Sequence, residues 1–245
     1  MVALYDTIGH GYAEIRQPDP AIERAILDGL ADATTVVNVG AGSGSYEPHD
    51  RALIAVELSP TMIRQRPPGA ATAIQADALS LPFRDNAFDA AMAILTVHHW
   101  TDQKRGLREL RRVSRGRVVI LTWDPAQSGR FWLMDYVPEI LDTDRHKFPQ
   151  LQEYEDALGP IEVVAVPIPH DCVDGFMCAY WRRPAAYLDP RVRGAISTFA
   201  KLGNITAELN KLREDLESGA WQRRYSDILN IGELDLGYRL IVAEA

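Results

Sequence analysis

The stretch that decides the fold is TTVVNVGAGSGSYEPHDRALIAVELSP, residues 34–60. Two short apolar runs flank a turn in which glycine occupies positions 40, 42 and 44, and Glu57 closes the second run. Glycine directly after a strand permits positive φ and lets a ligand approach the backbone closely. The stretch therefore predicts a nucleotide or nucleoside site between two neighbouring strands.

Similar apolar runs alternate with amphipathic stretches along the chain. Each run is short and nearly all apolar, as is typical of strands buried on both faces of a sheet. Residues 21–32 and 103–113 instead carry apolar side chains at helical spacing. The alternation predicts an α/β fold, a Rossmann-like doubly wound, mostly parallel seven-stranded sheet with a helical insertion before the last strand. The predicted strands are residues 34–39, 51–56, 71–76, 87–95, 117–123, 161–169 and 237–245.

Composition and charge limit the classes of function. The net charge of −8 argues against a nucleic-acid partner, since such proteins normally show a basic face. No run approaches the roughly 20 apolar residues of a membrane helix, and the N-terminus lacks the pattern of a secretory signal. Two cysteines are too few for a disulfide framework or a zinc site. We therefore expect a cytoplasmic protein with no membrane association and no metal; a homodimer is compatible with the sequence.

The glycine turn differs from a dinucleotide site. The dinucleotide fingerprint is G-x-G-x-x-G at the start of a helix whose N-terminus holds the pyrophosphate. Here position 45 is serine, and the third glycine comes one residue early, at Gly44. Residues 45–51 include Pro48 and leave room for at most about two helical turns. The turn is therefore a poor pyrophosphate site.

Glu57 indicates a nucleoside instead. An acid at the end of the second strand typically accepts both hydroxyls of a ribose. A ribose acid beside a turn with weak phosphate features points to S-adenosylmethionine as the cofactor. Two alternatives remain open: an NAD(P)-dependent oxidoreductase and a protein that binds S-adenosylmethionine without methylating.

Several motifs resemble those of class I S-adenosylmethionine-dependent methyltransferases, of the small-molecule type related to the ubiquinone-biosynthesis enzymes. They are VVNVGAGSGS at 36–45, IAVELSPTMI at 54–63 and IQADALSLPFRDNAFDAAMAILTVHHW at 74–100. The resemblance implies methyl transfer to a small-molecule acceptor, with Asp77 near the adenine amino group. Position 38 is asparagine where the family usually has an acid, although asparagine can still accept a hydrogen bond. The implied cofactor-binding residues are Asn38, Gly40, Ala41, Gly42, Gly44, Glu57, Leu58, Met62, Asp77, Ala78, Leu95 and Thr96.

The resemblance also suggests how the chain is divided. Because the sequence has no internal repeats or flexible linker, we expect one methyltransferase domain, residues 1–245, with a cofactor-binding core at 34–125. Residues 1–33 resemble a lid, in which Tyr12 and Arg16 would close over the cofactor; alternatively, they form a surface helix packed on the sheet. The helical insertion at 170–236 is expected to form the acceptor pocket.

Four residues are candidates for catalysis. His98 and His99 lie where the fourth predicted strand ends, and an imidazole there could act as a general base. Alternatively, they pack or shape the pocket. His170 and Asp171 follow the sixth predicted strand and could orient an acceptor or remove its proton, or simply form a turn with an aspartate cap.

Overall fold

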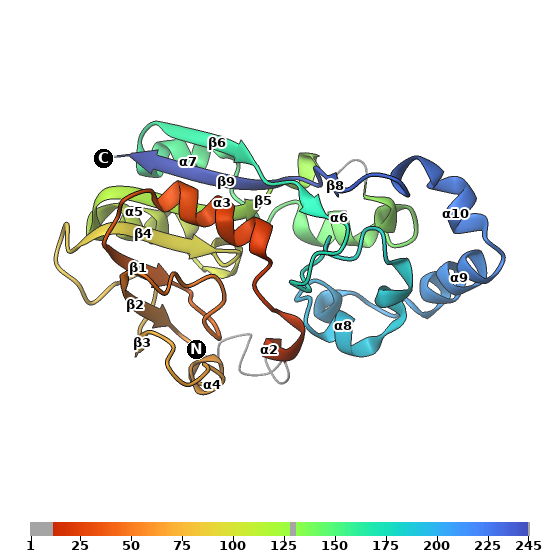
Figure 1. Ribbon diagram of the computed structural model, residues 1–245, viewed down its shortest axis with the longest axis horizontal. Helices are drawn as coiled ribbons and strands as arrows, with labels where there is room; N and C mark the ends of the chain where they lie inside the picture. The colour runs from red at the N-terminus through yellow and green to blue at the C-terminus, as the bar shows by residue number, and fades with distance from the viewer. Residues whose placement is uncertain (1–11, 128–130, 245) are drawn as a thin grey trace.

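The protein forms a seven-stranded sheet with a helical lobe at one end (Figure 1). The structure is a computed structural model that describes residues 12–127 and 131–244, except for the side chains of residues 12 and 13. The strand order is β3-β2-β1-β4-β5-β9-β6, in which the first five are parallel and β9 is antiparallel to both its neighbours. This confirms the predicted fold class. The strands are β1 Thr35–Val39, β2 Ala52–Glu57, β3 Thr72–Gln75, β4 Phe88–Ile94, β5 Ser114–Trp123, β6 Ile161–Ala165 and β9 Tyr238–Glu244.

Helices cover both faces of this sheet. α3 (Pro20–Leu30) begins at Asp19, whose side chain accepts a hydrogen bond from the backbone N–H of Ala21. Alternating residues of β5 explain the two layers: Val119 and Leu121 share a buried cluster with α3, whereas Val118 and Ile120 belong to the cluster on the other face. That second face is covered by α5 (Gln103–Val113) and α7 (Leu151–Leu158).

The predicted strand at 161–169 is divided in two. β6 ends at Ala165, and β7 (Ile168–Pro169) pairs instead with β8 (Glu233–Leu234) in a separate two-stranded sheet. The physical reason is Pro167, which has no N–H to donate to a continuing ladder. The β7–β8 pair forms the stem through which the chain enters and leaves the insertion.

The helical lobe lies beyond the carboxyl ends of the parallel strands (Figure 1). Residues before the predicted insertion also belong to it: the indole N–H of Trp132 donates a 2.5 Å hydrogen bond to the carbonyl of Trp181, and its ring meets Trp221 edge to face. The helices of the lobe are α2 Tyr12–Ile15, α6 Glu139–Asp144, α8 Pro190–Gly194, α9 Thr206–Glu217 and α10 Ala220–Arg224. The remaining helix, α4 Pro60–Arg64, follows β2 outside the lobe. Short 3-10 turns lie at Val97–His99, Pro125–Gln127, Trp132–Asp135, Pro184–Leu188, Phe199–Lys201 and Ser226–Ile228.

Two negative findings concern the described part of the chain. Between β1 and β2 it contains no helix, in agreement with the short link and its proline. Nor does any of its helices have the length and apolar character required to span a bilayer.

Candidate active site

A cavity of about 390 Å³ lies where β1, β2 and β4 end, between the sheet and the helical lobe. The topology explains its place, because parallel strands deliver the loops that follow them to one edge of the sheet. The described part of its wall brings together residues from six segments that are far apart in the sequence. Of the residues singled out from the sequence, the wall contains Arg16, Asn38, Gly40, Ala41, Gly42, Glu57, Leu58, Met62, Asp77, Ala78, Leu95, Thr96, His98 and His99.

The glycine turn is fixed by its neighbours. The backbone N–H groups of Gly40 and Ala41 both donate to the carbonyl of Val56, at 2.8 and 3.0 Å. Gly40 has a φ of +73°, and a Cβ at this position would lie 2.1 Å from Oγ1 of Thr96. Only glycine allows the turn to approach the end of β4 this closely.

Glu57 holds the same turn from the end of β2. Its Oε2 accepts a 2.8 Å hydrogen bond from the N–H of Gly42, and its Oε1 accepts one of 2.8 Å from the N–H of Ser59. The residue is 8% exposed and faces the cavity. The carboxylate therefore orders the glycine turn, in addition to its predicted role with a ribose.

Asn38 is oriented by a buried acid. Its Nδ2 donates a 3.1 Å hydrogen bond to Oε1 of Glu47, and Oε2 of Glu47 pairs with Arg66 at 2.6 Å. Because the amide nitrogen is engaged, Oδ1 remains the free acceptor; it is buried and has no hydrogen-bond partner among the described residues. The family usually has an acid at position 38. In this chain position 38 is asparagine, and the carboxylate of Glu47 lies one hydrogen bond away from it.

Arg16 reaches the cavity from the N-terminal segment. Its guanidinium forms an ion pair with Asp174, in which Nη2 lies 3.3 Å from Oδ2, and it lies over the ring of Phe176 at 5.9 Å. The backbones of Arg16 and Asp174 also form an isolated antiparallel β-bridge. The side chain of Tyr12, the other lid candidate, is outside the described residues.

His98 and His99 lie in the 3-10 turn after β4, with ring centroids 3.9 Å apart. The ring of His98 also stacks on Phe148 at 4.3 Å. Burial lowers the pKa of His98 well below its usual value, and burial followed by repulsion from Lys201 lowers the pKa of His99 to about 3. Both imidazoles are therefore neutral at physiological pH, the form that can accept a proton.

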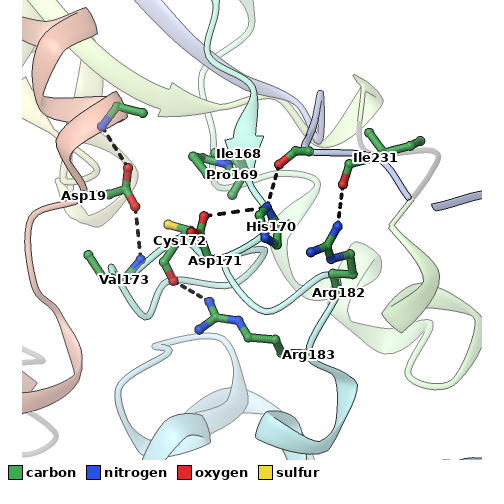
Figure 2. Close-up of polar contacts among 12 residues, drawn as sticks. Asp19, Ile168, Pro169, His170, Asp171, Cys172, Val173, Arg182, Arg183 and Ile231 are labelled. Atoms are coloured by element: carbon green, nitrogen blue, oxygen red, sulfur yellow. Dashed lines mark hydrogen bonds and ion pairs between the residues drawn. The ribbon is translucent and has the colours of Figure 1, made fainter. Parts of the chain in front are cut away.

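Three predicted residues are not on the described cavity wall. Gly44 lies on the far side of the turn, where a Cβ would come within 3.2 Å of the Arg66 guanidinium. Figure 2 shows His170 and Asp171 at the stem of the insertion: Nδ1 of His170 contacts the carbonyl of Gly232 at 3.1 Å, and Asp171 is exposed. The division of the predicted strand after Ala165 carries both residues away from the sheet edge.

Two arginines beside the stem have a structural role (Figure 2). Nη1 of Arg182 donates to the carbonyl of Ile231 at 2.9 Å, and Arg183 donates to the carbonyl of Cys172. These contacts bind the insertion to its own stem, so the two guanidinium groups hold backbone rather than a ligand.

Sequence reasoning missed part of the wall. Tyr46 follows the glycine turn with a φ of +61°, Trp100 follows the two histidines, and Lys201 comes from the insertion. Trp100 could have been found from its position beside His99. No sequence pattern marks Lys201, because it is a single lysine about 100 residues away from the motifs that it meets at the cavity.

A second recess, of about 50 Å³, adjoins the first cavity and shares Arg16, Leu95 and His98 with it. Most of its wall is apolar, with both aromatic and aliphatic side chains, and Arg16, Asp144, Ser197 and Thr198 add polar groups. Leu95, which lines both spaces, has a φ of +51°, an uncommon conformation for a residue with a side chain. The aromatic residues of the recess are Trp123, Phe148, Phe176 and Tyr238.

Comparisons with known proteins agree with this geometry. Residues 37–122 match the family model described as a methyltransferase domain. A solved structure from Anabaena variabilis, assigned as a methyltransferase of an antibiotic biosynthesis pathway, is 32% identical, has a TM-score of 0.86 and covers 94% of this chain and 99% of its own. Geranyl diphosphate C-methyltransferase of Streptomyces coelicolor, solved with S-adenosyl-L-homocysteine, has the same fold: its TM-score is 0.51 at 19% identity, over 91% of this chain and 78% of its own.

One comparison corrects an expectation. The tRNA (carboxymethyluridine(34)-5-O)-methyltransferase alkbh8 of Xenopus tropicalis is 31% identical over 68% of this chain, which spans 26% of that protein's length. Other curated relatives are also tRNA methyltransferases, so the exclusion of a nucleic-acid partner from net charge was wrong. Net charge averages over the whole surface and does not report the field of one face.

The family decides between the cofactors considered from the sequence. A nicotinamide-dependent oxidoreductase is set aside, and S-adenosylmethionine remains as the cofactor. The loop geometry, the family model and the full-length Anabaena relative lead to one conclusion. This chain belongs to the class I S-adenosylmethionine-dependent methyltransferases.

Proposed function

We propose that the chain transfers a methyl group from S-adenosylmethionine to a small-molecule acceptor bound between the sheet and the helical lobe. The observation that carries the proposal is the wall that the two spaces share, since Arg16, Leu95 and His98 line both. The cavity runs from Glu57 and Asp77 to His98, where it meets the aromatic recess. The Anabaena relative, similar over 94% of this chain, is assigned to an antibiotic pathway and therefore to small-molecule chemistry.

The described residues fit the cofactor. The buried Oδ1 of Asn38 lacks a partner and can accept a hydrogen bond from the ammonium of the methionyl group. Gly40 and Gly42 have positive φ and leave the floor of the cavity without side chains. Glu57 presents a carboxylate at the end of β2, where a ribose would be held.

The cofactor supplies an activated methyl group, and the chain supplies position and surroundings. The cavity walls align the acceptor and exclude water, which is the main protein contribution to such a displacement. Neutral His98 or His99 can accept the proton released by an O–H or N–H acceptor.

We also propose that the sheet and lobe form one domain, since one buried cluster extends from α3 into the lobe. A cytoplasmic location stays a prediction.

A tRNA acceptor is the second candidate. It is favoured by the names of several curated relatives, the Xenopus protein among them. The two candidates differ in what must reach His98. A nucleotide base would have to be turned out of its stack into the cavity, whereas a small acceptor enters alone.

Labelled methyl transfer distinguishes these candidates. The protein is incubated with methyl-labelled S-adenosylmethionine and either a small-molecule extract or bulk tRNA, and S-adenosylhomocysteine formation is followed. We expect label in the small-molecule fraction, and loss of that label in the Glu57→Ala variant. Label in tRNA alone would establish the second candidate, and binding without any product would favour a non-methylating protein.

A further inference from the structure

The two histidines lie among three positively charged side chains. Lys201 comes from the 3-10 turn Phe199–Lys201 in the insertion, Lys147 follows α6, and Arg16 comes from the N-terminal segment. Each of these cations lowers the pKa of both imidazoles by repulsion. This positive region lies inside a chain whose net charge is −8, so its sign is opposite to that of the molecule as a whole.

Two of the three cations form ion pairs with carboxylates of the protein. Arg16 pairs with Asp174, whose carboxylate is 1% exposed. Lys147 pairs with Asp144, which also accepts a 2.5 Å hydrogen bond from the hydroxyl of Thr198. Both acids are therefore committed to partners within the protein.

Lys201 is different. Among the described residues, no carboxylate lies within ion-pair distance of its ammonium group, which lines the cofactor cavity beside His99. Burial and repulsion from Lys147 lower the pKa of Lys201, and attraction from Asp144 only partly opposes them. Lys201 is exposed at the cavity wall, so water solvates its ammonium, and no carboxylate of the described residues competes with an incoming anion for it.

We propose that Lys201 binds a carboxylate of the acceptor, so that the substrates of this site are small organic acids whose apolar part faces the aromatic recess. One uncompensated cation matches one negative charge. The recess wall of Trp123, Phe148 and Tyr238 suits an apolar or aromatic body attached to that carboxylate. The inference rests on the proposed function, because it concerns the acceptor end of the same site.

An anion at Lys201 has a second effect on the site. His98 and His99 are weak bases because burial and the neighbouring cations both disfavour the imidazolium form. A carboxylate beside Lys201 adds a negative charge near His99 and makes protonation of that ring more favourable. An acidic acceptor therefore strengthens the base that its own methylation would use.

Matched pairs of acids and amides test the proposal. Protein saturated with S-adenosylhomocysteine is titrated with phenylacetate and phenylacetamide, indole-3-acetate and indole-3-acetamide, and octanoate and octanamide, using calorimetry. Each pair has the same body and differs in charge. We expect at least one acid to bind about threefold to fivefold more tightly than its amide, as for an ion pair with a solvent-exposed lysine, and the preference to weaken as salt is added.

Three variants complete the design. Measured on protein saturated with S-adenosylhomocysteine, Lys201→Ala should remove the preference for the acid and leave amide affinity unchanged, and Lys201→Arg should retain the preference. Lys211→Ala is the matched control, because Lys211 is an exposed lysine of the same insertion that pairs with Asp215. Equal affinity for acid and amide in every pair, no binding of any acid, or a preference that survives Lys201→Ala overturns the inference. Failure to bind S-adenosylhomocysteine would instead remove the proposed function.

Discussion

The hydroxyl of Tyr46 donates a 2.9 Å hydrogen bond to Oδ2 of Asp174, joining the glycine turn to the insertion. The same carboxylate binds the guanidinium of Arg16 from the N-terminal segment. Burial is the main cause that raises the pKa of the Tyr46 phenol, so it stays protonated and donates. One buried acid therefore connects the three parts of the chain that surround the cofactor cavity.

Asp174→Asn should weaken S-adenosylhomocysteine binding by about tenfold, because the amide cannot hold the Arg16 guanidinium by charge. Calorimetric titration measures the change, and thermal unfolding shows whether the variant is folded. Tyr46→Phe is the matched control, since it leaves the Asp174 charge in place while removing a hydroxyl that donates to Asp174 and accepts from the N–H of Asp19, and it should cost about 1–3 kcal/mol of stability. Unchanged affinity in folded Asp174→Asn would show that Arg16 needs no anchor.

Glu57→Ala should weaken S-adenosylhomocysteine binding by more than about tenfold, roughly 1.4 kcal/mol. The variant loses the predicted ribose acceptor and also frees the N–H groups of Gly42 and Ser59. The same titration measures the effect. Asp85→Ala serves as control because that acid is exposed and pairs with Arg112 away from the cavity; equal affinities in the two variants would disprove the ribose assignment.

Gly40→Ala should lower both stability and cofactor affinity, since its Cβ would lie 2.1 Å from Oγ1 of Thr96. The expected loss of unfolding free energy is about 1–3 kcal/mol, from strain at positive φ together with overpacking. Gly69→Ala separates the two causes, because Gly69 has a φ of +85° with no atom within 4 Å of an added Cβ. Urea unfolding of both variants is the measurement, and equal losses would mean that the clash contributes nothing.

Asp89 should make stability depend on acidity. Hydrogen bonds from Thr34, followed by those from Thr35, hold the pKa of its carboxyl well below the usual range. A depressed pKa in the folded state gives stability that is present above the unfolded value of about 3.9 and is lost as pH falls through the folded value. Asp89→Asn should therefore cost about 1 kcal/mol at pH 7 and progressively less below about pH 4.

Urea unfolding of the wild type and Asp89→Asn at several pH values between neutral and strongly acidic tests this sign. The difference between the two proteins should shrink as the carboxylate takes up a proton. A constant difference over the whole range would show that the loss is steric rather than electrostatic.

Local spacing was enough to predict which residues meet at the cavity wall where β1 and β2 end. Gly40 and Gly42 of the turn and Glu57 at the end of β2 are set by their places relative to two strands, and helix α5 was predicted with its observed bounds. Both signals depend on neighbours a few residues apart, which a sequence displays directly.

Contacts between distant segments could not be predicted in the same way. The Arg16–Asp174 pair spans 158 residues, and the division after Ala165 depends on how β7 meets β8. The sequence shows that position 38 is asparagine where the family usually has an acid. The buried Glu47 that hydrogen-bonds to Asn38 can be recognised only in the folded turn. The cations around His98 and His99 likewise became neighbours only through the lobe.

The antiparallel pairing of β6 and β9 has a consequence for how acceptor choice can change. Val166 N–H donates to the carbonyl of Tyr238 at 3.0 Å, so residues 166–237 leave the sheet and rejoin it at one place. A segment inserted in this manner can be exchanged as a cassette while the ladder on either side keeps its register. Replacing it with the equivalent segment of a relative should transplant Lys201 and its surroundings, and alter substrate preference while Glu57 and the glycine turn are inherited unchanged.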